Sequence, residues 1–206
     1  MAGASLLLLA GCATAPLPAA QVDLTGRSCA AQPDLGIATG LAFTGKEEQS
    51  FNVPFSGSDA CVQTAKGPAL YHAFQVPDGA EQLTFRLAST PQQNSLLPFR
   101  VILADSKGAV MRKFSGDALM FRGSQLSLLF RGHPGEAYLI VEADPGVTGQ
   151  SVSRIQESTG TAVAVTPAVA FAVHYGNDAT MSYIFTQTGV VTITLTPPPP
   201  PPPKTQ

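Results

Sequence analysis

The strongest constraint on the fold of this chain is a set of short runs in which apolar and polar residues alternate. Residues 82–87 read Gln-Leu-Thr-Phe-Arg-Leu, and residues 169–175 and 191–195 follow the same two-residue period. This period places one face of a strand in a core and the other face in solvent. Residues 137–143 are almost continuously apolar, which predicts a central strand covered on both faces. The pattern therefore predicts several short β-strands.

Turn-forming residues separate these runs. Clusters of Gly, Pro, Asn and Asp occur at residues 77–79, 105–108, 132–135, 144–146 and 176–178. Short strands punctuated in this way, without a long helical period, predict an all-β fold. We expect an antiparallel β-sandwich, either jelly-roll or immunoglobulin-like, over residues 41–196. Residues 147–160 are the least regular stretch and are predicted to be a long loop with at most one helical turn.

The charge balance excludes one class of partner. Charged residues make up 13% of the 206-residue chain, and the formal net charge is -2. A chain of this balance has no long-range attraction to a phosphate backbone, so no nucleic-acid partner is expected. The apolar fraction of 44% is high enough for a packed core, which excludes a disordered acidic chain.

The first twelve residues have the pattern expected of a targeting signal. Residues 6–10 are a short apolar run, and the block Leu9-Ala10-Gly11-Cys12 resembles the lipobox of bacterial lipoproteins. The resemblance implies that residues 1–11 are a signal peptide and that the Cys12 thiol carries a diacylglycerol, with palmitate among its acyl chains. Ala13 stands where lipoproteins kept at the inner membrane usually have Asp. The resemblance therefore implies a lipid anchor in the outer membrane, on its periplasmic face.

Extended segments flank the predicted sandwich. Residues 12–40 are small, Pro-bearing and aperiodic, which predicts a tether. Residues 197–206 begin with seven prolines, and such a run forms a polyproline II helix about 22 Å long at ~3.1 Å per residue. Two interpretations of this tail stay open, a docking peptide or stiff spacer, and a solvated tail that ends the last strand.

The cysteine count indicates a disulfide. With Cys12 assigned to lipid, Cys29 and Cys61 remain as a pair in an oxidising compartment. A disulfide between them would fasten the tether to the domain. The alternatives are two free thiols, or a metal site that adds His72.

No catalytic constellation is visible in the sequence. The histidines, at His72, His133 and His174, lie far apart, and the chain has no Gly-x-Ser-x-Gly elbow. The carboxylates that could form a glycosidase pair are Glu136, Glu142 and Asp144. Glu136 closes a predicted turn and Asp144 opens one, so turn formation accounts for both. We expect neither a cofactor nor a metal, and no enzymatic activity.

Four stretches resemble a known family. Residues 71–77, 83–89, 97–105 and 138–146 are similar in order and spacing to the maltose-operon periplasmic protein family, and more loosely to pre-peptidase C-terminal β-sandwich domains. The resemblance implies an all-β accessory protein of the periplasm, linked to carbohydrate uptake and without known catalysis.

A carbohydrate ligand would need flat aromatic side chains on which to stack. The chain has no Trp and four Tyr, among which Tyr175 at a strand end is the best candidate for a ligand contact.

Three functions are therefore weighed. The favoured hypothesis is a non-enzymatic lipoprotein of the cell envelope that serves as an accessory or structural subunit and binds another envelope protein or assembly. The second is a carbohydrate- or small-ligand-binding module of a transport system. The third is a hydrolase of envelope polymers, which would need a buried carboxylate or a His–Ser pair in a cleft.

Overall fold

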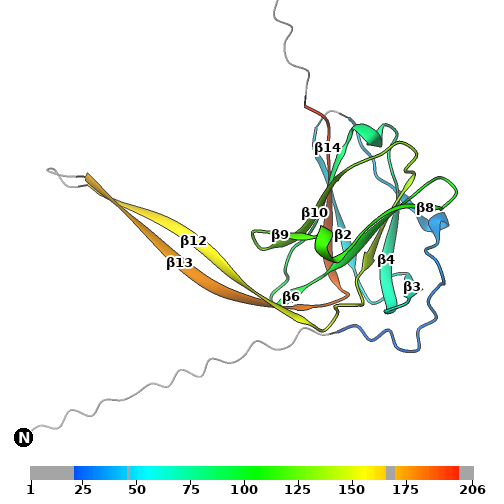
Figure 1. Cartoon of the computed structure of the whole chain (residues 1–206), viewed down its shortest axis with the longest axis horizontal. Helices are drawn as coiled ribbons and strands as arrows, with labels where there is room; N and C mark the ends of the chain where they lie inside the picture. The colour runs from blue at the N-terminus through cyan, green and yellow to red at the C-terminus, as the bar shows by residue number, and fades with distance from the viewer. Residues whose placement is uncertain (1–20, 46, 166–169, 200–206) are drawn as a thin grey trace, which may run out of the picture.

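Two β-sheets face each other in a sandwich, and a long β-hairpin projects from one end of it (Figure 1). The computed structural model describes residues 21–45, 47–165 and 170–199, and for residues 156–165, 170–175 and 177–178 it describes the backbone alone. The six-stranded sheet has the order β1 (Thr39–Gly40), β4 (Gly67–Gln75), β11 (Tyr138–Ala143), β7 (Phe99–Ala104) and β8 (Val110–Phe114), with β3 (Cys61–Thr64) also paired to β4. The five-stranded sheet has the order β2 (Gln49–Phe55), β14 (Gly189–Thr196), β5 (Thr84–Ser89), β10 (Gln125–Arg131) and β9 (Met120–Arg122). The expected all-β sandwich is confirmed.

The strand pairs are nested, which makes the sandwich a jelly roll. β7 pairs with β8, β5 with β10, β4 with β11 and β2 with β14, and each pair is antiparallel. The chain is thus one long folded hairpin wound into two sheets, with its first and last long sandwich strands paired outermost. Of the two topologies expected, this nesting selects the jelly roll over the immunoglobulin-like arrangement.

The core lies between the two sheets and explains the alternating runs. Phe85 and Leu87 of β5 and Ile193 of β14 are fully buried, and they are the apolar members of the alternating segments. In β11, Leu139 and Val141 face this core, whereas Ile140 packs in a second cluster on the outer face of the sheet. β11 is therefore covered on both faces, as its continuous apolar run predicts.

The segment before β1 lies against the sandwich. Leu24 is buried in the main core, and Leu35, in the short 3-10 helix η1 (Leu35–Ile37), packs on the outer cluster. The Asp34 N–H donates a 2.8 Å hydrogen bond to the Tyr71 hydroxyl. Cys29 and Cys61 form a disulfide, so the predicted pairing is confirmed. Leu24 thus enters the core between the sheets, and the part of the expected tether from Asp34 to Ala38 forms a layer over the outer face of the six-stranded sheet.

The projecting hairpin, here called the arm, consists of β12 (Ser151–Val165) and β13 (Ala170–Phe185). The two strands pair residue for residue from Ser151–Ile184 to Val165–Ala170. At the root, β13 continues into a two-residue parallel pairing with β6 (Ser95–Leu96). Figure 1 shows the yellow and orange arm leaving the sandwich with no third strand along most of its length.

The arm corrects three predictions. Residues 176–178, expected to be a turn, lie inside β13, so Tyr175 is not at a strand end. Residues 147–160 do not form a long loop, because the turn ends at Gln150 and β12 begins at Ser151. The start of β12 is Ser-Val-Ser-Arg-Ile-Gln, and the side chains of residues 151 to 155 are exposed or half-buried. Val152 packs against a small buried cluster of Leu96, Leu126 and Tyr183 at the arm root, whereas residues 153–155 are exposed, so the two-residue hydrophobic signal at the start of β12 is weak.

Helical structure in the described part of the chain is confined to single turns, namely η1, η2 (Ala80–Gln82) and η3 (Gly116–Ala118). No helix among the described residues has the length and apolar character needed to span a membrane.

Candidate functional site

The residues expected to carry function fall into different parts of the chain. Cys12, the expected lipid attachment point, lies outside the described residues. Tyr175, the expected ligand contact, pairs with Gly160 on the arm, and its side chain also lies outside the described part. Lipidation at Cys12 and ligand contact at Tyr175 therefore stay predictions.

Glu136 forms a buried ion pair at one end of the sandwich. The side chain of Glu136 is 1% exposed, and it accepts hydrogen bonds from Arg112 Nε at 2.6 Å and from Arg112 Nη2 at 2.9 Å. The backbone N–H of His133 donates a third hydrogen bond, at 2.8 Å. The Arg112 guanidinium also lies over the rings of Phe114 and Phe130, 5.3 and 5.5 Å from their centroids. The Arg112–Glu136 pair thus connects the turn at residues 133–136 and the edge strand β8 to the aromatic end of the core.

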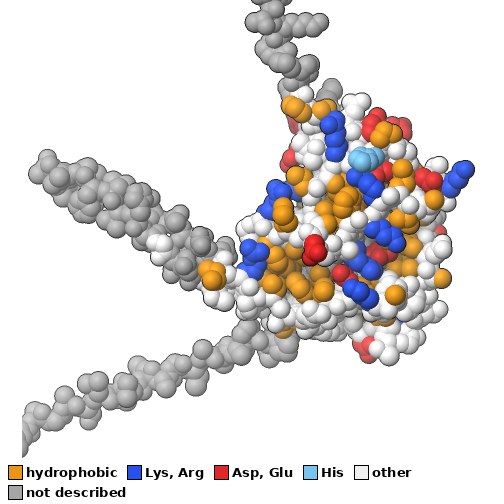
Figure 2. Space-filling model, viewed as in Figure 1, with side chains coloured by type: hydrophobic (Ala, Val, Ile, Leu, Met, Phe, Trp, Pro, Cys, Tyr) orange, Lys and Arg blue, Asp and Glu red, His pale blue; other side chains and the backbone are white. Residues whose placement is uncertain are grey.

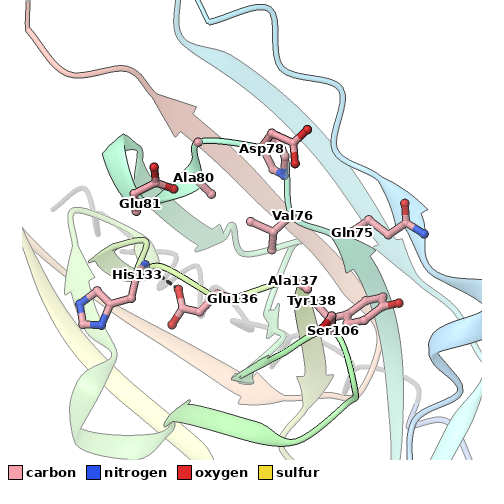
Figure 3. Close-up of a pocket in the computed structure, with 13 residues that line it drawn as sticks. Gln75, Val76, Asp78, Ala80, Glu81, Ser106, His133, Glu136, Ala137 and Tyr138 are labelled. Carbon is pink, nitrogen blue, oxygen red and sulfur yellow. Dashed lines mark hydrogen bonds between the residues drawn. The ribbon is translucent and has the colours of Figure 1, made fainter.

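A hollow of about 470 Å³ lies beside this ion pair (Figure 3). Its walls come from residues 75–81 and 133–138, and Figure 3 shows the Asp78 carboxylate turned away from Glu136. Both oxygens of Glu136 are engaged by Arg112, and the His133 ring is exposed. Among the described groups that line this hollow, the only buried acid is Glu136, and Arg112 binds both of its oxygens. The geometry therefore favours a structural role for Glu136.

A second carboxylate lies on the outer face of the six-stranded sheet. Glu142 of β11 stands directly opposite Arg100 of β7, and Arg100 Nη2 donates a 2.8 Å hydrogen bond to Glu142 Oε2. Burial raises the pKa of the Glu142 carboxyl above its ordinary value, and the nearby charges of Arg100 and Lys113 oppose that rise. The pair lies in an open groove of about 600 Å³ between residues 31–35 and the β7–β8 hairpin.

The remaining titratable candidates have structural partners. Asp144 Oδ1 accepts a hydrogen bond from the Gly146 N–H, as its turn position predicts. His72 lies 3.2 Å from Asp59 and contacts the Phe55 ring edge-on. The described residues contain no group of three His, Cys, Asp or Glu side chains that could hold a metal ion. The disulfide also removes the alternative in which Cys29 and Cys61 bind metal with His72.

The strand edges of the sandwich differ from those of the arm. In the sandwich, β2 contains Pro54, β8 carries two charges and an irregular register, and β1 and β9 have only two and three residues. Such features protect edges against pairing with other chains. The arm strands have 15 and 16 residues, contain neither Pro nor Lys, and are paired on one side only along most of their length. The arm is therefore the least protected β-edge in the described structure.

Side chains near the arm root add apolar surface. Ile155 is 66% exposed and Met181 is 40% exposed. Charged residues on the two strands are Arg154, Glu157 and Asp178, and residues 158–165 and 170–173 contain none. A segment that combines high β-propensity with low charge pairs readily with other strands. By contrast, Figure 2 shows cationic, anionic and apolar side chains intermixed over the visible face of the sandwich.

Searches for similar proteins matched no protein-family model, no curated protein and no solved structure. The resemblance to the maltose-operon periplasmic protein family thus stays a prediction. A jelly roll hosts many unrelated functions, so the fold alone assigns none.

Sequence reasoning missed three features that matter for function. It did not find the arm, the Arg112–Glu136 pair or the Arg100–Glu142 pair. The partners in the two ion pairs are 24 and 42 residues apart, and no local pattern links them. One signal was available for the arm, namely the uncharged, Ala- and Val-rich composition of residues 161–173.

Proposed function

We propose that this protein is a non-enzymatic, lipid-anchored accessory subunit of the cell envelope that binds another envelope protein by strand pairing along the arm. The single observation that carries the proposal is a hairpin of about 15 residues per strand whose two outer edges are unpaired over most of their length. About half of the backbone N–H and C=O groups of each strand point away from the partner strand in such a ribbon.

The energetics of a two-stranded ribbon support pairing with a further strand. An isolated hairpin is marginally stable in water, and a third strand adds both hydrogen bonds and buried side-chain area. One edge of β13 already pairs with β6 at Ile184 and Phe185. A strand from a partner that paired along the rest of this edge would therefore extend an existing sheet. This mode of recognition, addition of a strand to an open edge, is common among envelope assembly proteins.

Insertion of the single arm into lipid is disfavoured by the same open edges. Unpaired backbone groups cost several kcal/mol each in hydrocarbon, so open sheet edges do not occur there. A protein partner satisfies these groups, and a bilayer does not. The N-terminal lipid, where present at Cys12, would serve to place the arm at the membrane rather than to bury it.

Site-specific photocrosslinking in cells tests the proposal. A photoreactive amino acid is placed at Ile155 or Met181 on the arm, and at Leu129 on the outer face of the five-stranded sheet as a control with similar exposure, 49%. We expect both arm positions to crosslink to one other envelope protein, and Leu129 not to do so. Ile155→Lys should abolish the crosslink formed from Met181, because a charge beside the edge opposes close pairing, whereas Leu129→Lys should leave it intact.

Three results would contradict the proposal. Crosslinks from the arm only to a second copy of the chain would replace the accessory role with self-assembly. Crosslinks of equal strength from Leu129 would show that the arm is not the interface. No crosslink from either arm position, with the protein folded and located in the envelope, would remove the arm from the function.

A further inference from the structure

The groove on the outer face of the six-stranded sheet combines an apolar floor with cationic side chains. Ile140 of β11 and Ile102 of β7 stand opposite each other on this face and form the floor. Residues 31–35 and β3 form one wall, and Val110, which is 52% exposed, lies on the other. A cavity of about 600 Å³ is in the range of sites that hold small molecules, which is about 300–1,000 Å³.

The charges around the groove are unbalanced. Arg100, Lys107 and Lys113 line it, and Glu142 is the only carboxylate among its lining residues. Glu142 is engaged by Arg100, whereas Lys107 and Lys113 are exposed and form no ion pair within the described structure. The groove therefore has an excess of positive charge over an apolar floor, so an anion is the complementary ligand.

Arg100 is only partly engaged by the chain and partly exposed in the groove. Its Nη2 donates to Glu142, but its Nε–H is buried and has no acceptor. The side chain as a whole is 21% exposed, so a ligand oxygen at the exposed part of the guanidinium would add a charge-assisted hydrogen bond. The guanidinium is also the group best shaped for carboxylate and phosphate oxygens.

We propose that this groove binds an anionic amphiphile, with its carboxylate or phosphate monoester group at Arg100 and Lys113 and its acyl or alkyl chain over Ile102 and Ile140. Lys113 stands opposite Ile102 across the β7–β8 pairing, so a single ligand can contact the cation and the floor together. Lys107 lies on the hairpin loop at the far rim, where it adds to the positive field. The same chemistry occurs in a free fatty acid or alkyl phosphate and in the headgroup of an anionic phospholipid.

Ligand titration followed by the methyl NMR signals of isoleucine tests the proposal. The full chain carries Cys12→Ser so that no detergent competes for the apolar floor. Dodecyl phosphate, below its micelle concentration, should shift the signals of Ile102 and Ile140. Dodecanol and inorganic phosphate, which each supply one half of the ligand, should bind at least about fivefold more weakly. The affinity for dodecyl phosphate should fall as salt is raised, because the lysines lie at an exposed rim.

Matched lysine variants separate the groove from the rest of the surface. Lys113→Gln should weaken dodecyl phosphate about two- to fivefold, the range for one exposed charge contact. Lys66→Gln removes an exposed lysine that does not line the groove and should leave the affinity unchanged. Binding of vesicles rich in anionic phospholipid that is lost in Lys113→Gln would identify a membrane lipid as the source of the ligand, whereas binding of free dodecyl phosphate without vesicle association would identify a soluble amphiphile.

Several outcomes would overturn the proposal. Equal affinity for dodecanol and dodecyl phosphate would show that the cations play no part. Equal affinity for inorganic phosphate and dodecyl phosphate would show that the apolar floor plays no part. Unchanged Ile102 and Ile140 signals at saturating dodecyl phosphate, or an equal loss of affinity in Lys66→Gln, would place any binding elsewhere.

Discussion

Removal of the disulfide should destabilise the sandwich by an amount that follows from chain length. Cys29 and Cys61 are separated by 32 positions. In the chain-entropy model, closing a loop of that size removes about 12 cal/mol/K from the unfolded chain, or about 3.7 kcal/mol at 25 °C. The double variant Cys29→Ala/Cys61→Ala is preferable to serine, because Cys61 is buried and a serine hydroxyl there would lack a partner.

Two measurements check this prediction. Urea unfolding should give a free energy of unfolding about 3–4 kcal/mol lower in the double variant. Thermal unfolding should show a midpoint lower by about 7–15 °C, from about 2–4 °C per kcal/mol for a chain of this size. Alkylation of the unfolded, unreduced wild type should modify neither Cys29 nor Cys61, which controls for incomplete oxidation.

Hydrogen exchange then shows whether the loss of stability in the double variant is confined to the layer over the six-stranded sheet. The Asp34 N–H, bonded to the Tyr71 hydroxyl, reports on the layer over the six-stranded sheet. If the disulfide acts by fastening that layer, Asp34 should lose protection at denaturant concentrations where Leu139 of the central strand keeps it. A double variant with unchanged free energy of unfolding and unchanged protection at Asp34 would refute the reasoning, because the closed loop would then constrain neither state.

The remaining predictions concern single substitutions. Glu136→Gln should lower the free energy of unfolding by about 2 kcal/mol, less than the about 3–5 kcal/mol of a fully buried pair because the arginine partner is 23% exposed; urea unfolding measures this. Gly132→Ala should cost about 1–3 kcal/mol in the same assay, because a Cβ would overlap the carbonyl oxygen of Ala80. Burial raises the pKa of Glu142 above 4.5, so its contribution to stability is fully present below pH 4.5 and is lost as the pH rises through the folded-state pKa. The stability of wild type relative to Glu142→Gln should therefore fall as the pH rises above 4.5, and a stability difference that does not change with pH would contradict the prediction. Cys12→Ser should abolish incorporation of labelled palmitate, and persistent labelling would remove the predicted anchor.

The strands of the sandwich that the sequence predicts have at least one face in a core. Residues 82–87 and 191–195 alternate because Phe85, Leu87 and Ile193 pack between the sheets. The start of β12 escaped prediction because, among residues 151–155, only Val152 packs against buried residues, so the hydrophobic pattern there carries little periodic signal. The burial of a strand therefore leaves a local pattern in the sequence, which alternates where one face is buried and is continuously apolar where both faces are buried.

The topology and the ion pairs depend on contacts between distant residues. β2 pairs with β14 across more than half of the chain, and nothing local in either strand specifies the other. The same applies to Glu136, whose position in a turn is evident from the sequence but whose pairing with Arg112 is not. The disulfide could be predicted because two cysteines remain after Cys12 and only one pairing is possible.

The two chain ends leave the sandwich on opposite sides. Gln21 Nε2 donates a hydrogen bond to the Phe185 carbonyl at the arm root, whereas Thr196 is bonded to Glu48 at the other end, where Figure 1 shows β14 ending. From Cys12 to Gln21 the chain can reach at most about 30 Å, at ~3.3–3.6 Å per residue. A molecule held at Cys12 would therefore keep the arm root within about 30 Å of the bilayer surface. The arm itself would extend a further ~50 Å at ~3.3 Å per residue. The proline segment would then emerge at the far pole. If the proposed lipid anchor is correct, the molecule would thus have one pole, with the arm, close to the membrane and a second pole, with the end of β14, away from it.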